Sequence, residues 1–474
     1  MRARVLTVAL ALCAAATGCS DGDDPTTPSQ PGGTTLWGRR FGKSTGTDPV
    51  ALAVGGAGEV VVGGRFFATT DFGSGPVTSP ANNWQAFVAK YDGEGAPVWS
   101  KSLGDIFEEQ VTTVALDGAG NVYVAGTFRG TIDLGNGPLE SEQLGVDLFV
   151  AKLAPDGSPL WSKHIGTDSF DQLDGMEVDA QGGVALVGHV GNGADFGTGP
   201  MTFNGAPFVA KLEPSGTVAY ITALEFALEF GGYPSAFGVD SAGAIVVAAT
   251  YYDEYEGQGL YVSKLGPAGQ PAWAHDFPGV GDNVSVTDLS VADDDSIFLS
   301  GSLGLVINLG GGVMSSVSQD SYYGDVFAAA LAPDGAPRWV RRFAPQRGRV
   351  DEFDNPLPGW LVANAIAAVD GGLVLTGSFL GETDLGGGAR QSAGYAELEN
   401  AYSDDVFALR LDADGSYLWD TTFGNTNQQA ATSVDADPTG DVFLAGWANG
   451  GLSFGDGGYA DTGYYDGFVV KLAR

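Results

Sequence analysis

Short apolar stretches recur along the chain from Leu36 to its end. They are rich in Val, Phe and Tyr, and each stops at Gly, Asp or Pro, the residues that favour tight turns. After the N-terminal segment, no long stretch places apolar residues at the 3.6-residue spacing of a helix. The pattern therefore predicts an all-β chain of short strands joined by turns, with essentially no α-helix.

These strands form a repeating unit, which is clearest in its second copy. The four apolar stretches of that copy are Trp99–Gly104, Val111–Asp117, Asn121–Phe128 and Leu148–Leu153. An aromatic anchor and a strand resembling Phe-Val-Ala-Lys recur in each of seven units, which predicts a seven-bladed β-propeller of four-stranded antiparallel blades. The anchors are Trp37, Trp99, Trp161, Tyr220, Trp273, Trp339 and Trp419. The Phe-Val-Ala-Lys-like strands begin at Phe87, Phe149, Phe208, Tyr261, Phe327, Phe407 and Phe468.

The phase of the repeat indicates how the ring closes. The repeats open with a lone anchor strand, Leu36–Gly42, which is of the fourth-strand type. They end on a third-type strand that runs to Arg474, so the last unit lacks its outer strand. We expect the N-terminal strand to complete the last blade, because this removes the exposed sheet edges of an open array. Trp37 is then predicted to be buried in the blade that both termini share.

Two stretches of the second unit carry a resemblance to a known group. They are VALDGAGNVYVAGTFRGTIDLG (Val114–Gly135) and DLFVAKLAPDGSPLW (Asp147–Trp161). They resemble bacterial lipoproteins of the myxobacterial type that are built from the β-propeller repeat called SBBP. The resemblance covers residues 36–474 and implies a propeller fold and export. It implies no reaction, since that group has no agreed activity.

The N-terminus has the features of a processing segment. Arg2 and Arg4 precede an apolar run from Val5 to Ala16, which is too short to span a bilayer and is typical of a secretory signal peptide. The run ends at Ala16-Thr17-Gly18-Cys19, which resembles the cleavage motif of bacterial lipoproteins. We therefore divide the chain into a signal peptide (1–18), a lipidated Cys19 with a disordered polar tether (19–35) and the propeller (36–474). The alternative is a soluble secreted protein with an incidental Cys19.

This division predicts a protein of the cell envelope. It would be anchored by lipid, in the outer membrane, and would face either the periplasm or the cell surface. The membrane contact would be through the lipid anchor alone, and the protein is expected to be a monomer.

The net charge of the chain limits the kinds of molecule that it is expected to bind. The chain has 22 Lys and Arg against 58 Asp and Glu, a net charge of −36. Removing Arg2 and Arg4 with the signal peptide gives −36 − 2 = −38. A chain this acidic is a poor nucleic-acid binder, because phosphate neutralisation needs a basic surface. Three His and two Cys argue against a His/Cys metal centre and leave the exported domain without disulfides.

Several motifs resemble functional signatures but have simpler explanations. The Asp-Phe-Gly and Asp-Leu-Gly segments at Asp71, Asp133, Asp195 and Asp384 recur once per unit, as expected of side-chain-stabilised turns. Asp412-Ala-Asp-Gly and Pro155-Asp-Gly close hairpins, although they are similar to calcium loops. We expect no cofactor, with weak calcium binding left open at three acidic clusters. The clusters are Asp293/Asp294/Asp295, Asp168/Asp171/Asp174 and Asp351/Glu352/Asp354.

Two further features of the sequence bear on whether the protein is an enzyme. The stretch AKLAPDGSPLW resembles the tryptophan-docking motif of quinoprotein propellers, but the spacing of Gly157 and Trp161 fits packing between blades. His164, His189 and His275 are isolated in the sequence, and His164 and His275 are expected on the surface of fourth strands. We expect a protein that is not an enzyme. A hydrolase that uses two carboxylates stays an open alternative.

The loops predict where a partner would bind. First-to-second and third-to-fourth turns emerge on one face and are short, whereas second-to-third loops and inter-blade connections emerge on the other and are long. The sixth unit has two large inserts, Ala344–Trp360 and Gly381–Ser403. Tyrosine and arginine dominate binding hot spots, so the face is predicted to hold a protein partner, with a glycan or adhesion ligand as the alternative. The candidate binding residues are Tyr322, Tyr323, Arg347, Arg349, Tyr395 and Tyr402. The other tyrosines of the second-to-third segments are Tyr251, Tyr252, Tyr255, Tyr459, Tyr464 and Tyr465.

Overall fold

The computed structural model describes residues 31–42, 46–80, 83–105, 107–141, 145–203, 207–224, 233–253, 257–280, 284–304, 306–310, 312–317, 324–347, 359–393, 403–454 and 465–474. Within these residues the chain consists of strands and turns, and no α-helix occurs, as the sequence pattern predicts. In this part of the chain, no helix has the length and hydropathy needed to cross a bilayer.

The described strands form seven four-stranded antiparallel sheets, six of which are simple meanders. Sheet 1 holds β2 (Thr47–Val54), β3 (Val60–Phe66), β6 (Gln85–Tyr91) and β7 (Pro97–Leu103). Sheet 2 holds β8 (Gln110–Leu116), β9 (Val122–Phe128), β12 (Asp147–Leu153) and β13 (Pro159–Ile165). Sheet 3 holds β14 (Gln172–Val178), β15 (Val184–His189), β16 (Phe208–Leu212) and β17 (Val218–Ala223). Sheet 4 holds β18 (Tyr233–Val239), β19 (Ile245–Asp253), β20 (Gly257–Leu265) and β21 (Pro271–Phe277).

In sheets 5 and 6 the four strands also follow one another along the chain, whereas sheet 7 takes one strand from the N-terminal end. Sheet 5 holds β23 (Val284–Val291), β24 (Ile297–Leu303), β27 (Asp325–Leu331) and β28 (Pro337–Phe343). Sheet 6 holds β30 (Trp360–Val369), β31 (Gly372–Leu380), β34 (Asp405–Leu411) and β35 (Tyr417–Phe423). Sheet 7 holds β36 (Gln429–Ala436), β37 (Val442–Asn449), β38 (Tyr465–Leu472) and, from the other end of the chain, β1 (Thr35–Phe41).

Small accessory strands decorate the segments between the second and third strands. They are β4 (Thr69–Asp71) with β5 (Pro76–Thr78), and β10 (Thr131–Asp133) with β11 (Pro138–Glu140). Two three-stranded groups are β22 (Gly279–Val280) with β25 (Val306–Asn308) and β26 (Val313–Ser315), and β29 (Pro345–Arg347) with β32 (Glu382–Asp384) and β33 (Ala389–Gln391). In four of the hairpin turns one Asp carboxylate accepts two backbone N–H groups, as Asp71 does from Gly73 and Gly75. The turn interpretation of the Asp-Phe-Gly segments is therefore confirmed.

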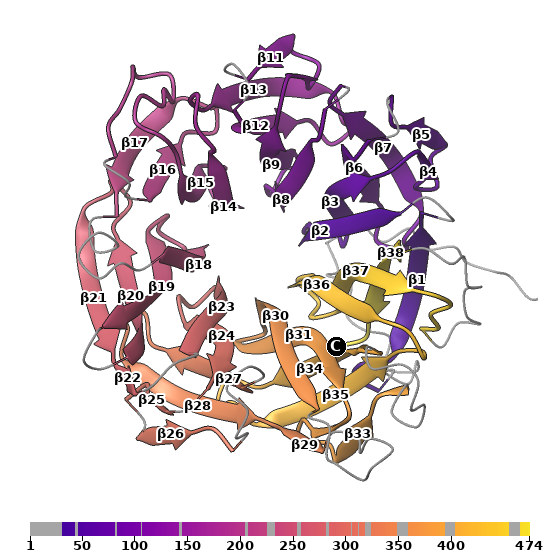
Figure 1. The fold of residues 1–474 in the computed structure, drawn as a ribbon, viewed down its shortest axis with the longest axis vertical. Helices are drawn as coiled ribbons and strands as arrows, with labels where there is room; N and C mark the ends of the chain where they lie inside the picture. Colours follow the sequence, from indigo (N-terminus) through magenta and orange to yellow (C-terminus); the bar gives the residue numbers. More distant parts are fainter. Residues whose placement is uncertain are drawn as a thin grey trace, which may run out of the picture.

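The sheets stand around a common centre, with the first strand of each sheet innermost and the fourth outermost (Figure 1). Every residue of β6, β12 and β34 is buried, as expected of strands covered on both faces by neighbouring sheets. The hydrophobic clusters lie between sheets: one joins sheets 1 and 2, another sheets 6 and 7, and a third sheets 7 and 1. Cohesion therefore comes from apolar packing of each sheet on the next.

The two ends of the chain meet in sheet 7. The strand β1 pairs antiparallel with β38 from Thr35 to Phe41, and the Gly33 N–H donates to the Ala473 carbonyl at 2.9 Å. This pairing begins slightly before the predicted Leu36. Trp37 is half-buried rather than buried, because one side of its indole is covered by the ring of Phe443 in the same sheet, at 5.9 Å between ring centroids, and the outer edge of the strand stays open.

The anchor aromatics connect neighbouring sheets. The indole N–H of Trp99 donates to the Pro155 carbonyl at 3.0 Å, which lies in the third-to-fourth turn of the next sheet. Gly157 of that turn has φ 81°, and a Cβ there would stand 3.2 Å from the Trp99 ring. The packing role of the anchor is thus confirmed, but Gly157 packs under Trp99 of the preceding sheet and not with Trp161 of its own. Equivalent indole hydrogen bonds join Trp37 to Gly93, Trp161 to Pro214, Trp273 to Pro333 and Trp339 to Ala413.

The N-terminal segment supplies the missing turn of sheet 7. Trp419 of sheet 6 has no third-to-fourth turn to pack on, because the third strand of sheet 7 ends the repeat. Its ring instead lies over Gly33, where a Cβ would come within 2.9 Å of it, and Gly33 has φ 77° like the turn glycines. Two chain ends held by backbone hydrogen bonds thus replace a covalent hairpin turn.

The pairing of β1 with β38 makes a prediction about stability. Deleting Leu36–Gly42 should lower the melting temperature by more than Trp37→Ala does, because the deletion exposes the edge of β38 and Trp37→Ala removes one half-buried ring. For Trp37→Ala we expect a loss of about 3 kcal/mol, at the low end for tryptophan truncation. A synthetic peptide of residues 31–42 should restore stability to the deletion variant in differential scanning calorimetry.

Trp99→Ala is the matched control, since Trp99 makes the same contact away from the chain ends. It should destabilise the protein about as much as Trp37→Ala, and the peptide should not rescue it. A deletion variant that melts like the parent would contradict the role given to β1.

Candidate functional site

One face of the molecule is built from the short turns. We call it the short-turn face; the opposite face, with the second-to-third segments and the inter-sheet connections, is the long-loop face. At the short-turn face, a cation near the end of the third strand pairs with an acid in the first-to-second turn of the same sheet, as Lys152 Nζ does with Asp117 Oδ2 at 3.1 Å. The pairs are Lys90–Glu59, Lys152–Asp117, Lys211–Asp179, Lys264–Asp240, Arg410–Asp370 and Lys471–Asp437. Sheet 5 has Ala330 at the cation's position.

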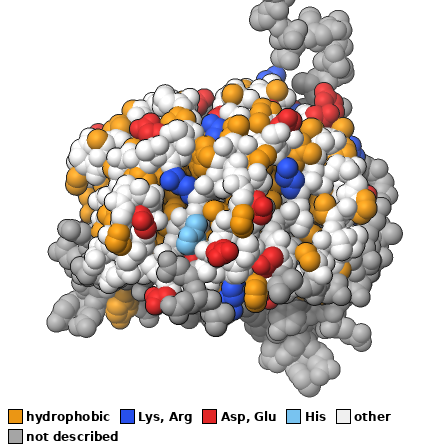
Figure 2. Space-filling view, turned by 90° about the horizontal axis from the view of Figure 1, so that it is seen from above, with side chains coloured by type: hydrophobic (Ala, Val, Ile, Leu, Met, Phe, Trp, Pro, Cys, Tyr) orange, Lys and Arg blue, Asp and Glu red, His pale blue; other side chains and the backbone are white. Residues whose placement is uncertain are grey.

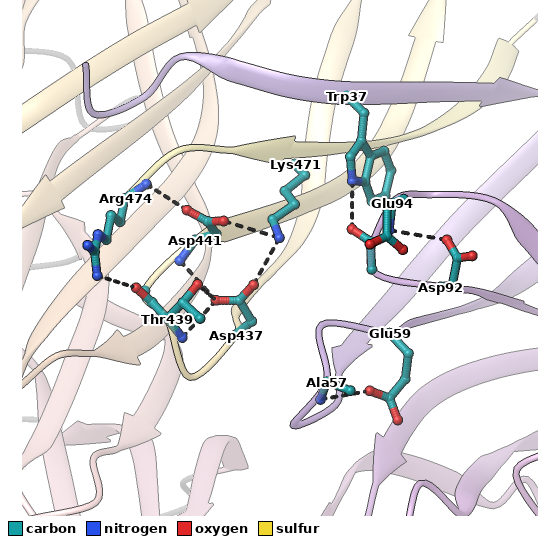
Figure 3. A network of polar contacts seen from close by, with 12 residues as sticks. Trp37, Ala57, Glu59, Asp92, Glu94, Asp437, Thr439, Asp441, Lys471 and Arg474 are labelled. Carbon is teal, nitrogen blue, oxygen red and sulfur yellow. Dashed lines mark hydrogen bonds and ion pairs between the residues drawn. The ribbon is translucent and has the colours of Figure 1, made fainter. Parts of the chain in front are cut away.

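Figure 3 shows this arrangement where sheet 7 meets sheet 1. Lys471 Nζ lies 3.0 Å from Asp437 and 3.1 Å from Asp441, and the backbone N–H of Arg474 donates to Asp441 at 3.1 Å. Burial alone would raise the pKa of Asp437, but hydrogen bonds from Thr439 and Lys471 lower it below its usual range. These cation–acid pairs therefore contribute to the cohesion of the sheets at this face.

The second feature is a central channel, lined by the first strands of all seven sheets. A cavity of about 550 Å³ lies between them. In the described chain, each first strand carries a β-bulge at the same position of the repeat, between residues such as Val111 and Thr113 or Ala431 and Ser433. Bulges of this kind redirect side chains and break strand pairing.

Asp174, Glu177, Asp288 and Asp435 line the channel, and three of these carboxyl groups contact the backbone of the next sheet. Each accepts a backbone N–H from the first strand of the following sheet: Glu177 from Val239 at 2.8 Å, Asp288 from Ile366 at 2.9 Å and Asp435 from Val54 at 2.7 Å. These N–H groups belong to the free inner edges of the sheets and have no strand partner. The carboxylates therefore satisfy edge backbone, which is a structural role.

The channel changes the acidity of these groups. Burial raises the pKa of Glu177 to about 8, with the charges of Asp288 and Asp435 adding to the effect. Burial likewise raises the pKa of Asp288 and of Asp435 to about 6. At neutral pH Glu177 is mostly protonated, and the channel carries less negative charge than its composition indicates.

The third feature is a pocket on the long-loop face, where sheets 1, 2 and 3 adjoin. We call it the loop-face pocket. Its volume is about 770 Å³, and aromatic side chains with large exposed fractions stand at it, 73% for Phe170 and 39% for Phe107. Its lining also includes Arg65, Trp84, Glu109 and Arg129. A concave pocket with aromatic walls and a few convergent polar groups is the usual form of a small-ligand site.

Glu109 is the unusual group in this pocket. Its side chain is 1% exposed, and Oε2 accepts a hydrogen bond from the Gln85 side chain at 2.6 Å, whereas Oε1 has no hydrogen-bond partner. Burial raises its pKa to about 8, although a backbone hydrogen bond from Asp105 acts in the opposite direction. Burial thus favours the neutral carboxylic acid form of Glu109, and the charge of Asp105 adds to the effect.

The residues that the sequence singled out for binding are not placed by the structure. Cys19, Tyr322, Tyr323, Arg349, Tyr395 and Tyr402 lie outside the described residues. The backbone of Arg347 is described: it pairs with Glu382 of β32. Among the other predicted tyrosines, Tyr252 is 58% exposed and Tyr465 is 47% exposed. Tyr251 is 7% exposed with its hydroxyl donating to Asp276 at 2.6 Å, so its assignment to a binding surface is wrong: the second strand buries it.

The histidines, which are isolated in the sequence, each have a polar partner in the structure, and His164 and His275 lie on the fourth strands β13 and β21 as expected. His164 Nε2 lies 2.6 Å from Asp147 Oδ2, and His189 Nδ1 lies 3.2 Å from Asp174. His275 Nε2 contacts the Asp334 carbonyl at 2.9 Å. These pairs form because sheet geometry brings together residues from neighbouring strands or sheets, which residue spacing along the sequence does not reveal.

The acidic clusters are largely used in turns. Asp171 is fully buried and accepts the N–H groups of Thr167 and Gly191, so it is not part of a solvated surface. Asp295 accepts from Ser241 of the neighbouring sheet, and the Asp412 carboxylate caps its own hairpin. Residues 351–354 lie outside the described chain. Among the residues that the structure covers, no three or more His, Cys, Asp or Glu side chains are grouped to hold a metal ion.

No family model matches the chain. The regulatory protein FlaEY of Caulobacter vibrioides is 28% identical over 165 residues, which are 33% of this chain and 17% of FlaEY, so the chain spans far less than two thirds of that protein. Among solved structures, puromycin hydrolase has a TM-score of 0.45 at 13% identity, over 90% of this chain and 54% of that one. YCF48 bound to D1 peptide has a TM-score of 0.41 at 11% identity, over 92% and 95% of the two chains. The β-propeller domain of the Trilobed protease from Pyrococcus furiosus has a TM-score of 0.41 at 10% identity, over 90% and 97%.

The channel acids predict an inverted pH dependence of stability. Their folded-state pKa values are raised, so the folded protein holds more protons than the unfolded chain between about pH 4 and pH 8. Their stabilising contribution is complete below the unfolded pKa near 4 and is lost as pH rises through the folded values. Glu177→Gln should therefore reduce the fall in unfolding free energy between pH 6.5 and 8 by roughly 1 kcal/mol.

Chemical denaturation at both pH values measures this difference. Glu213→Gln is the control, because Glu213 is an exposed acid in the turn between β16 and β17. Identical pH profiles for the Glu177 variant, the Glu213 variant and the parent would show that the channel acids do not hold extra protons.

Proposed function

We propose that the chain is an exported seven-bladed β-propeller that is tethered by a lipid on Cys19 and holds a protein partner of the cell envelope on its long-loop face. The pairing of β1 with β38 and the hydrogen bonds between sheets 7 and 1 support a closed ring. The N-terminal sequence supports export and tethering. The membrane contact proposed here is through the lipid alone.

The observation that carries the binding role is the difference between the two faces. Six sheets hold a cation–acid pair at the short-turn face, as described above. Large apolar side chains are exposed beside the short turns, such as Val98 at 51% and Leu160 at 50%, but the two most exposed lie on the long-loop face, Phe170 at 73% and Val313 at 70%. Exposed apolar side chains on a rigid scaffold are typical of a surface that binds another molecule. The others on this face are Phe107, Tyr252, Val317 and Tyr465.

The side of the molecule shows no large area of a single charge (Figure 2). Acidic and basic side chains are scattered singly over the side of the molecule in Figure 2, with hydrophobic side chains between them. A binding mode based on a continuous acidic patch is therefore not favoured by the side that this view presents. The inserts of the sixth unit, with Arg347, Arg349, Tyr395 and Tyr402, remain our proposed contact region together with Tyr322 and Tyr323.

Partner capture from membranes tests the proposal. The intact lipoprotein should retain a partner, and exchange of Ala344–Trp360 for the shorter connection Gly424–Gln428 should abolish capture while the melting temperature stays that of the parent. Phe170→Ser is the parallel variant on the other side of the same face, and it separates a sheet 5–6 contact from a sheet 1–3 contact. Capture at the parental level by both variants would remove the long-loop face from consideration.

Tethering is tested separately. Cys19→Ala should abolish incorporation of labelled palmitate and release the protein from washed membranes, because Cys19 is the one cysteine that remains after residues 1–18 are removed. Cys13→Ala is the control and should label like the parent, since Cys13 lies within the segment that is removed. Equal labelling of the Cys19 variant would contradict the anchor.

A second candidate function is the binding of a glycan, and the loop-face pocket favours it. A cavity of about 770 Å³ suits a ligand of a few rings, whereas a protein partner needs a flatter contact of about 800 Å² per side. The two functions do not exclude each other, because the pocket and the sixth-unit inserts belong to different sheets.

A further inference from the structure

We propose that the loop-face pocket binds a saccharide that carries a carboxylate group, such as a short oligouronate, through an aromatic wall, a buried carboxylic acid and two arginines. This inference rests on the second candidate function, glycan binding, and specifies its site and ligand class.

The walls of the pocket suit a ring with one apolar face. Trp84, Phe107 and Phe170 present aromatic surface to it, and Phe170 is 73% exposed. Exposing an apolar ring to water costs free energy, and the C–H face of a pyranose covers such a ring well. Neutral hydrogen-bonding side chains complete the lining, so hydroxyl groups find both donors and acceptors there. They are Asn83, Gln110, Thr112, Thr127 and Gln172.

Glu109 provides the second, independent observation. The repeat places Asp171 and Gln429 at the equivalent position of sheets 3 and 7, immediately before or at the start of the first strand. Asp171 accepts N–H groups with both of its oxygens, and Gln429 accepts the N–H of Asn425. Glu109 is equally buried, but its Oε1 has no partner. A buried polar atom without a partner is unfavourable, and a ligand hydroxyl at that oxygen would give it one.

Two arginines at the pocket, Arg65 and Arg129, indicate that the ligand is negatively charged. Arg65 lies over the ring of Trp84, with 4.7 Å from Cζ to the ring centroid, and pairs with Asp48 at 3.1 Å. Arg129 is exposed at the pocket and makes no ion pair or hydrogen bond with the described residues. Arg129 thus presents an exposed guanidinium at the pocket, and this group binds a carboxylate through two parallel hydrogen bonds.

The two other acidic residues of the lining, Glu108 and Asp171, do not remove this preference for a negatively charged ligand. The oxygens of Asp171 are engaged by backbone N–H groups, and Glu108 is exposed to water at the rim. Glu109 is protonated at neutral pH for the reasons given above, so it can donate to a ligand oxygen rather than repel the carboxylate. The ligand thus needs hydroxyl groups, an apolar ring face and one negative charge, which together describe a uronic-acid saccharide.

Titration calorimetry of the purified intact lipoprotein in neutral detergent tests the inference. The probe is trigalacturonate, and its methyl ester is the reference, since esterification removes the charge and keeps the rings. We expect saturable binding of trigalacturonate at pH 6.5 and at least tenfold weaker binding of the ester. Arg129→Met should weaken trigalacturonate at least tenfold and leave the ester unchanged. Phe170→Ser should weaken both.

Matched variants separate the pocket from general effects. Lys101→Met removes one positive charge on β7, beside the turn glycine Gly157 and outside the pocket lining, and should bind as the parent does. Glu109→Gln should keep binding at pH 6.5 and remove the loss of affinity that the parent shows as pH rises through about 8. Each variant is accepted for titration when its melting temperature is within a few degrees of the parent's.

Three outcomes overturn the inference: no saturable binding of trigalacturonate, equal loss in the Lys101 and Arg129 variants, or preference for an acidic tripeptide over the saccharide. These outcomes leave the protein-partner proposal standing if membrane capture by the Arg129 variant stays at the parental level. Failure of capture together with intact saccharide binding would instead remove the protein-partner proposal alone.

Discussion

The free backbone edge of each first strand is the constraint on which the rest of the structure depends. Seven strands turn an unpaired edge toward the central channel, and an unpaired N–H or carbonyl away from water is costly. The preceding sheet supplies the partners from its own first strand. Glu177, Asp288 and Asp435 accept edge N–H groups, and Thr113 donates to the Met176 carbonyl of the next sheet at 3.2 Å.

The densest set of these contacts lies between sheet 7 and sheet 1. Thr432, Ser433 and Asp435 all bond to the backbone of β2, at 2.9, 3.2 and 2.7 Å. At this junction β1 leads into β2, as each fourth strand leads into the next first strand elsewhere, and the covalent gap lies within sheet 7, between β38 and β1. The acidity of the channel follows from the same need, because carboxylates that serve edge backbone are taken out of bulk water and their pKa values rise.

The two faces of the molecule have different structural roles. Indole hydrogen bonds and buried cation–acid pairs hold the short-turn face, where every turn has nearly the same form. The long-loop face does not have to hold neighbouring sheets together, since the strands beneath it are already held in place. Phe107 and Phe170 can therefore remain exposed on it without loss of the contacts that hold the sheets together.

The sequence by itself determined the local order of this protein. Residue patterns account for the strand boundaries, the four-strand unit, the absence of helix in the described chain, the turn role of Asp71-Phe-Gly and the pairing of the N-terminal strand. Each of these features depends on contacts within one unit or on the phase of the repeat.

Tertiary structure alone decided the rest. That Tyr251 is buried, that His164 meets Asp147, that Gly157 packs under Trp99 and that Glu177 shares a channel with Asp435 depend on how sheets face one another. A weak signal for the channel acids exists in the sequence: Glu177 and Asp435 stand where the other units have Ala, Gly or Ser. Only the packing of sheets around one centre turns that difference into a charge at a free backbone edge.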